Sequence, residues 1–155
     1  METRKVVLIA VVAALYVVLT VGLAPISYSF IQFRVSEALK ILVLFDPWLS
    51  LGIGFGTFLA NMASPFVGPW ELIWMPLTDV LGGILAWLIY KKAHAAIAMG
   101  VYAVTTGLAV GLMLYVLGVG AFWLMVGTVA ASELIILIGG LPFMMFVGRW
   151  LENRR

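Results

Sequence analysis

The sequence contains no cysteine and a single histidine, His94. A chain without cysteine has neither disulfide bonds nor thiolate ligands for a metal, and one imidazole cannot build a metal site by itself. The sequence has no His/Cys or Ser/His arrangement that would indicate covalent catalysis, and no H-E-x-x-H motif that would indicate metal-assisted catalysis. We therefore expect no enzymatic activity, no catalytic residue, no bound metal and no cofactor in this chain.

Charged residues are also scarce, at 10% of the chain against 65% hydrophobic residues. A water-soluble chain normally carries about 25% charge, so this one would expose large apolar patches in water and aggregate. The sequence therefore predicts an integral membrane protein. With about 20 apolar residues per span, the 155 residues allow about six spans and leave no room for a nucleotide-binding domain. Any use of ATP then needs another polypeptide.

The apolar runs are separated by short segments rich in Pro, Gly or charge, which are typical breaks between helices. They predict an all-α fold, a six-helix transmembrane bundle that forms one membrane domain over residues 1–155. The expected spans cover about 5–24, 34–45, 48–63, 70–90, 94–117 and 121–147. The segments 26–33 and 64–69 are the longest expected loops on one side.

Six crossings put both termini on the same side of the membrane. Seven of the nine Lys and Arg residues then fall on that side, namely Arg4, Lys5, Lys91, Lys92, Arg149, Arg154 and Arg155. By the positive-inside rule this side is the cytoplasm. We expect a multi-pass protein of the cell membrane, surrounded by lipid, with both termini cytoplasmic. Its net charge of +2 reflects this orientation rather than nucleic-acid binding.

Small residues at four-residue spacing allow helices to approach closely in a membrane. In the third and fifth spans they occur at Gly52, Gly56, Ala60, Ser64, Gly107 and Gly111. These stripes favour ordinary packing inside the bundle. In the first span, Ala10 and Ala14 share one face, which either packs internally or forms a docking surface for another membrane subunit. Spacing alone favours internal packing.

Ionisable residues inside a bilayer cost at least about 2.5–3.5 kcal/mol each, so they usually face a cavity or a partner. Asp79 lies near the middle of the fourth span and Glu133 near the middle of the sixth. Glu71 lies near the external end of the fourth span, on the same face as Asp79. A buried carboxylate needs a ligand, a proton or a cation, and Lys40 is the nearest candidate counter-ion.

Further polar residues gather in the external half of the predicted bundle. Arg34, Glu37 and Lys40 recur every three residues and can pair along one face, in a structural or a functional role. Gln32 and Asn61 add amide groups. Aromatic rings, Trp74 among them, accompany these groups. The pattern predicts a pocket open to the exterior for a small, flat, hydrogen-bonding ligand.

Two segments carry a family resemblance: 31–39 (IQFRVSEAL) and 60–65 (ANMASP). With six small spans, they resemble the queuosine-precursor transporter family, substrate-binding S components of energy-coupling factor (ECF) transporters. The resemblance implies high-affinity binding of a 7-deazaguanine precursor or queuine-like base from outside. It also implies docking onto a transmembrane coupling protein that carries two cytoplasmic ATPase subunits.

In such S components an Ala-x-x-x-Ala face of the first helix contacts the coupling protein, and Ala10 and Ala14 stand in that position. Where the family commonly has Asp after the Ser-Pro loop, this chain offers Glu71. Motif positions and the intramembrane residues together give the expected substrate-binding residues Gln32, Arg34, Glu37, Asn61, Glu71, Trp74, Asp79 and Glu133.

Two other functions fit the same sequence. The chain could be an S component for another small vitamin, because the architecture does not specify the substrate. It could also be a stand-alone proton-coupled secondary transporter that uses Asp79 and Glu133 as its proton relay. The absence of an evident inverted repeat disfavours that second alternative.

Overall fold

The structure, a computed structural model, describes residues 2–29 and 32–153. Within these ranges every regular element is helical, so the predicted all-α class is confirmed there. The elements are α1 (Thr3–Gly22), α2 (Ala24–Ser27), η1 (Val35–Leu44), α3 (Leu49–Asn61), η2 (Trp70–Trp74), α4 (Met75–Tyr90), α5 (Ala95–Val116) and α6 (Phe122–Glu152). Ile31, Arg154 and Arg155, which the sequence analysis used, lie outside the described residues.

Four helical segments in the described chain are long and apolar enough to cross a membrane: Thr3–Gly22, Trp70–Tyr90, Ala95–Val116 and Phe122–Glu152. The other two expected spans are shorter. The ten residues of η1 form a 3₁₀-helix and extend about 20 Å. The 13 residues of α3 also extend about 20 Å, against a hydrocarbon core of about 30 Å.

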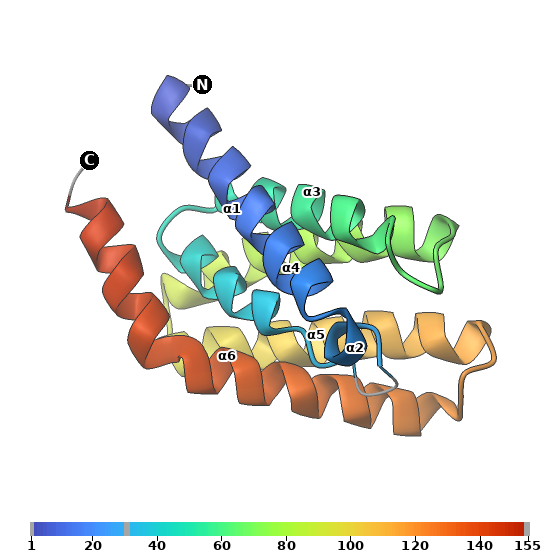
Figure 1. The fold of residues 1–155 in the computed structure, drawn as a ribbon. Helices are drawn as coiled ribbons and strands as arrows, with labels where there is room; N and C mark the ends of the chain where they lie inside the picture. Colours follow the sequence, from blue (N-terminus) through green and yellow to red (C-terminus); the bar gives the residue numbers. More distant parts are fainter. Residues whose placement is uncertain (1, 30–31, 154–155) are drawn as a thin grey trace.

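Successive elements run in alternating directions along the bundle, and both ends of the described chain lie at the same end of it (Figure 1). Helix α5 packs along α6, and α1 packs along α3. Between these pairs lies η1, in contact with α1, α3, α4 and α6. Most of its residues are buried, so η1 is the central element of the fold.

Glycine allows the closest of these approaches. A Cβ atom at Gly56 of α3 would lie 2.8 Å from the Cβ of Tyr16 in α1, and one at Gly52 would lie 2.7 Å from the carbonyl oxygen of Ile9. At Gly107 of α5 a Cβ would lie 2.6 Å from the Cβ of Ala130 in α6. Since no side chain fits at these distances, the predicted packing role of both stripes is confirmed.

The fourth span begins with a π-helical turn, η2, before it continues as α4. Pro76 has no N–H for the carbonyl of Leu72, and its ring would clash with that carbonyl in a regular helix. The wider turn removes this conflict. It also places Glu71 fully inside the bundle, with no exposed surface.

Helix α6 continues to Glu152, beyond the predicted end of the sixth span at residue 147. Gly148 does not end the helix. It leaves room for the ring of Phe45, which any Cβ at this position would meet. Figure 1 shows that α6 bends within its C-terminal part, as expected for a helix with an internal proline, Pro142.

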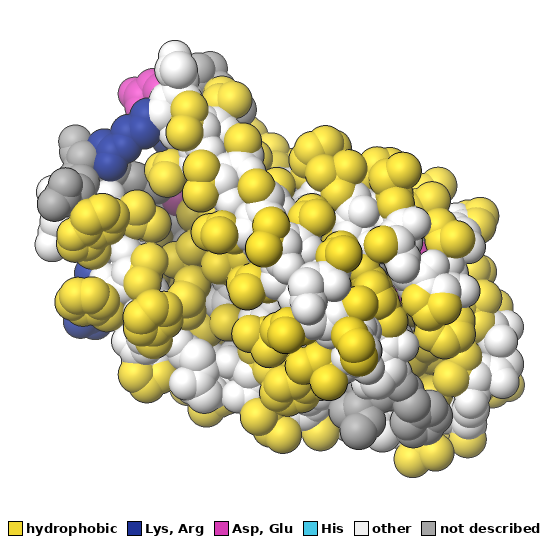
Figure 2. Space-filling view, viewed as in Figure 1, with side chains coloured by type: hydrophobic (Ala, Val, Ile, Leu, Met, Phe, Trp, Pro, Cys, Tyr) yellow, Lys and Arg dark blue, Asp and Glu magenta, His cyan; other side chains and the backbone are white. Residues whose placement is uncertain are grey.

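The outer surface is largely apolar. Figure 2 shows one face covered with hydrophobic side chains, whereas Lys and Arg side chains gather at the end that holds both termini. In η2 and α4, Ile73, Leu77 and Leu81 are 66%, 49% and 58% exposed, while Asp79 on the opposite face is buried. The fourth span thus has an apolar outer face and a polar or small inner face.

Candidate ligand-binding site

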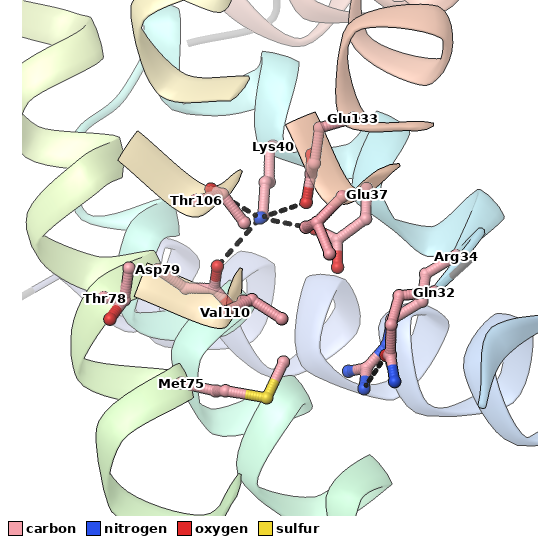
Figure 3. A pocket seen from close by; sticks show the side chains of 11 residues that line it. Gln32, Arg34, Glu37, Lys40, Met75, Thr78, Asp79, Thr106, Val110 and Glu133 are labelled. Carbon is pink, nitrogen blue, oxygen red and sulfur yellow. Dashed lines mark hydrogen bonds and ion pairs between the residues drawn. The ribbon is translucent and has the colours of Figure 1, made fainter. Parts of the chain in front are cut away.

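Lys40 lies at the centre of the bundle with no exposed surface. Its Nζ is 2.6 Å from Oε2 of Glu37, 2.8 Å from Oδ1 of Asp79 and 3.1 Å from Oε1 of Glu133. It also donates to Oγ1 of Thr106 at 3.4 Å (Figure 3). These five residues, the Lys40 cluster, come from η1, α4, α5 and α6. The predicted counter-ion role of Lys40 is confirmed by its contacts with Asp79 and Glu133.

Side chains outside the Lys40 cluster orient its carboxylates. The hydroxyl of Tyr16 in α1 donates to Oε1 of Glu37 at 2.6 Å. Thr57 of α3 donates to Oδ2 of Asp79 at 2.6 Å. With these two bonds, α1 and α3 also contact the cluster, so six helical elements meet around one ammonium group.

The 3₁₀ geometry of η1 explains the contact between Glu37 and Lys40. A 3₁₀-helix has three residues per turn, so side chains at i and i+3 lie directly above one another. The expected pairing along this face is therefore present for Glu37 and Lys40. Arg34, which precedes η1, instead contacts Gln32 of its own segment and Asn61 and Glu71 of other segments.

A second polar group, the Arg34 group, consists of Arg34, Gln32, Asn61 and Glu71. Arg34 donates through Nη1 to Oδ1 of Asn61 at 2.9 Å and through Nη2 to Oε1 of Gln32 at 3.0 Å. Its Nη2 is 3.9 Å from Oε1 of Glu71. Asn61 also donates to the backbone oxygen of Glu71 at 2.9 Å. The group thus fixes the start of η1 to the end of α3 and to η2.

Tyr28 covers the Arg34 group from the segment before η1. Its hydroxyl donates to the carbonyl oxygen of Ala60 at 2.5 Å, and its ring lies 5.4 Å from Cζ of Arg34. Burial raises the pKa of the Tyr28 hydroxyl, and the charge of Glu71 raises it further against the opposing effect of Arg34. The phenol therefore stays protonated and keeps donating at physiological pH.

A small cavity lies between the Lys40 cluster and the Arg34 group (Figure 3). Its volume is about 10 Å³, which is room for about one water molecule. The lining consists of Gln32, Arg34, Glu37, Lys40, Met75, Thr78, Asp79, Thr106, Val110, Val129 and Glu133. Most of these side chains are polar, which is unusual for the interior of such an apolar chain.

Several buried polar atoms around the cavity have no hydrogen-bond partner among the described residues. In the cavity lining at one end these atoms are donors, Nε2 of Gln32 and Nε of Arg34. Behind Arg34, both carboxylate oxygens of Glu71 also lack a hydrogen-bond partner in the described part of the chain. Near Lys40 the unpaired atom is an acceptor, Oε2 of Glu133. Leaving such atoms unpaired costs about 1–3 kcal/mol each. Their arrangement is suited to a ligand with acceptors at one end and donors at the other.

The structure brings most of the predicted site residues to this cavity: Gln32, Arg34, Glu37, Asp79 and Glu133 line it. Asn61 and Glu71 lie behind Arg34. Trp74 lies further away, where its Nε1 donates to the carbonyl oxygen of Ala109 at 3.0 Å. Ligand contact by any of these residues stays a prediction.

Some members of the site were not predicted. Thr106 lines the cavity, and Tyr16, Thr57 and Tyr102 contact the acidic residues or Lys40; the ring of Tyr102 lies 4.8 Å from Nζ of Lys40. The two tyrosines lie in apolar spans, where a hydroxyl needs a partner. A tyrosine in an apolar span therefore indicates a buried polar contact, although the sequence does not identify the partner of its hydroxyl.

A helical bundle with several membrane-length apolar helices and a small polar cavity at its centre is a polytopic membrane protein. The sequence matches the QueT transporter family over residues 6–149, and the chain belongs to this family.

The chain is also similar to a curated protein, the queuosine precursor transporter QueT of Lactococcus lactis subsp. cremoris (strain MG1363). The two are 38% identical over 91 residues, which cover 57% of this chain and 48% of the relative. The matched part thus spans about half the length of that relative. No solved structure matches the chain.

Proposed function

We propose that this protein is the substrate-binding subunit, or S component, of an ATP-driven ECF importer. It binds a 7-deazaguanine queuosine precursor or a queuine-like base from the exterior. Membership of the QueT transporter family and the name of the Lactococcus relative, a queuosine precursor transporter, support this proposal. The chain itself catalyses no reaction, and ATP is hydrolysed by partner subunits.

The small polar cavity between Lys40 and Arg34 is the observation that carries the proposal. A carboxylate accepts two N–H bonds from the edge of a guanine-like ring, and Glu37 or Glu133 provides that group. The free N–H groups of Gln32 and Arg34 can donate to a ring carbonyl at the opposite end. A deazaguanine offers this combination of donors and acceptors on one small, flat molecule.

Binding requires the cavity to enlarge. Small-molecule sites usually have about 300–1,000 Å³, whereas this cavity has a volume of about 10 Å³. The segment before η1 is the expected gate, because Gln32 and Arg34 form the wall that faces away from Lys40. Its displacement opens the site without moving the long helices.

The proposal includes six membrane crossings with both termini in the cytoplasm. The alternating directions of successive elements and the common end of both termini support this topology (Figure 1). The exposed basic residues Arg4, Lys91, Lys92 and Arg149 lie near the ends of helices, as the positive-inside rule requires. In the same topology the cavity is entered from the exterior.

Docking to the coupling protein takes place on the outer face of α1. Ala10 and Ala14 are both exposed, whereas Ala13 beside them is buried against the bundle. Small exposed residues let another membrane helix approach closely. The coupling protein carries two cytoplasmic ATPase subunits, whose hydrolysis of ATP drives reorientation of the S component.

Binding and transport are tested separately. Calorimetry on the purified chain in detergent is expected to detect binding of a 7-deazaguanine base without ATP. Liposomes with this chain alone are expected to take up no base, and uptake is expected once the coupling protein, ATPases and internal ATP are supplied. The absence of heat or a thermal shift with any deazaguanine would refute the substrate, and binding of another vitamin in the same screen would replace it.

The Lys40 cluster supports one alternative function. Linked buried acids such as Asp79 and Glu133 are the usual components of a proton relay. A stand-alone proton-coupled transporter would therefore accumulate the base in liposomes under a pH gradient, without ATP or partner proteins. Such uptake by the isolated chain would replace the ECF mechanism.

A further inference from the structure

The two polar groups around the cavity contain more buried acids than buried bases. Four carboxylates face two cations: Glu37, Glu71, Asp79 and Glu133 against Arg34 and Lys40. Each of the six side chains is buried. The formal excess is two negative charges, which is costly in an interior where no solvent screens them.

The excess is concentrated at the Lys40 end. In the Arg34 group, one guanidinium faces one carboxylate, that of Glu71. In the Lys40 cluster, three carboxylates share one ammonium. Thr57 donates a further hydrogen bond to Asp79, and Tyr16 donates one to Glu37, but these hydroxyl donors carry no charge. The cluster therefore has neutral hydrogen-bond donors but too little positive charge to balance its three carboxylates.

Glu133 has the free atom that a cation needs. Its Oε1 contacts Lys40, whereas its Oε2 is buried without a hydrogen-bond partner in the described chain. Glu133 is 5% exposed and lines the cavity. At the Lys40 end of the cavity, Figure 3 shows Glu133 beside Lys40, with Glu37 between Glu133 and Arg34.

We infer that the site selects a cationic base, one whose ring substituent carries a protonated amine held by Glu133. This inference rests on the proposed function and specifies the charge of the substrate. The amine brings to the Lys40 cluster the positive charge that it lacks, while the ring edge binds the remaining donors and acceptors. Neutral deazaguanines fit the same cavity without that charge pairing.

Three ligands of nearly equal size test the inference. They are 7-aminomethyl-7-deazaguanine, its neutral isostere 7-hydroxymethyl-7-deazaguanine and 7-cyano-7-deazaguanine. Calorimetry in detergent at neutral pH is expected to give an affinity about tenfold higher for the amine than for either neutral base, because hydrogen bonds to charged groups are the stronger ones. The ratio of these affinities in the wild-type protein tests the preference for a cationic base even if no variant folds.

The substitution Glu133→Gln identifies the residue responsible. It keeps the side-chain shape and is expected to reduce the preference for the amine over the neutral bases from about tenfold to about twofold. Glu152→Gln is the matched control, because Glu152 is an exposed acid on the same helix. Its preference is expected to equal that of the wild type.

The outcomes separate the two proposals. Equal affinity for all three bases would show that protons rather than ligand offset the acidic excess, and would overturn the inference while the proposed function stands. An unchanged preference in the folded Glu133→Gln variant, shown by its binding of the neutral bases, would overturn the role of Glu133. Failure of all three bases to bind would refute the proposed function itself.

Discussion

The Nζ of Lys40 lies 2.8 Å from Oδ1 of Asp79, and this contact joins the central 3₁₀-helix to α4 inside the bundle. Neither side chain is more than 5% exposed. The same ammonium contacts Glu37 and Glu133. Each carboxylate therefore depends on Lys40 for charge balance, and Lys40 determines how the helices around the cavity fit together.

Replacement of Lys40 is expected to destabilise the protein more than replacement of any surface lysine. Lys40→Met leaves three buried carboxylates without their cation, and breaking a buried ion pair costs about 3–5 kcal/mol. Thermal unfolding in detergent is expected to show a clear loss of stability. Lys92→Met, at an exposed position, is the matched control and is expected to unfold like the wild type.

A further substitution identifies the cause of that loss. Adding Glu133→Gln and Asp79→Asn to Lys40→Met removes two of the uncompensated charges, so part of the stability is expected to return. If Lys40→Met unfolds at the same temperature as Lys92→Met, the ion pairs of the Lys40 cluster do not stabilise the bundle.

Gln32 combines an unusual backbone conformation with a side chain that lines the cavity. Its φ is 55°, a left-handed conformation that costs a residue with a side chain about 1–2 kcal/mol. Gln32→Ala keeps this cost and Gln32→Gly removes it. We expect Gln32→Gly to be the more stable variant by about 1 kcal/mol. Both variants lose the amide and are expected to bind a deazaguanine equally weakly.

Thermal unfolding measures the first effect and calorimetry the second. Equal stability of the two variants would contradict the backbone argument. Wild-type affinity in both would show that the amide of Gln32 does not contact the ligand.

Thr57 and Thr105 are expected to respond differently to the same substitution. Thr57 donates to the carboxylate of Asp79, whereas Thr105 donates to carbonyl oxygens of its own helix. Thr57→Val removes a partner from a buried acid and is expected to cost about 1 kcal/mol, the usual value for such bonds in membrane proteins. Thr105→Val is expected to cost less. Thermal unfolding of both variants measures the difference, and equal losses would contradict it.

These threonines show where sequence reasoning reaches its limit. Both are single hydroxyls in apolar helices, and nothing in the local pattern distinguishes one that bonds its own helix from one that bonds Asp79. The inner face of α4 was predictable because 3.6-residue periodicity places Asp79, Gly82 and Gly83 together. Its partners depend on which helices lie opposite, and that information is tertiary.

The helical elements with non-α geometry also could not be predicted from the spacing of residues in the sequence. The interval of three from Arg34 to Lys40 is compatible with an α-helix, and the 3₁₀ form of η1 depends on the helices packed around it. Residue 147 is the expected membrane boundary of the sixth span, and α6 extends past it to Glu152. A helix continues past that boundary as long as no residue breaks it.

The outer face of α1 gives the sharpest test of the proposed partner. Ala14 is exposed there, and a bulky side chain at this position keeps another helix from approaching closely. Ala14→Trp is therefore expected to leave deazaguanine binding in detergent unchanged. With the coupling protein and ATPases in liposomes, ATP-driven uptake is expected to fall about tenfold or more, as for other central interface residues.

Ala131→Trp is the matched control, because Ala131 is equally an exposed alanine but lies on α6. Lipid accommodates a large apolar side chain there, so binding and uptake are both expected to match the wild type. Equal uptake by the two variants would place the coupling protein on another face of the bundle. Weaker ligand binding by Ala14→Trp would instead show that α1 acts on the cavity, through the bond from Tyr16 to Glu37.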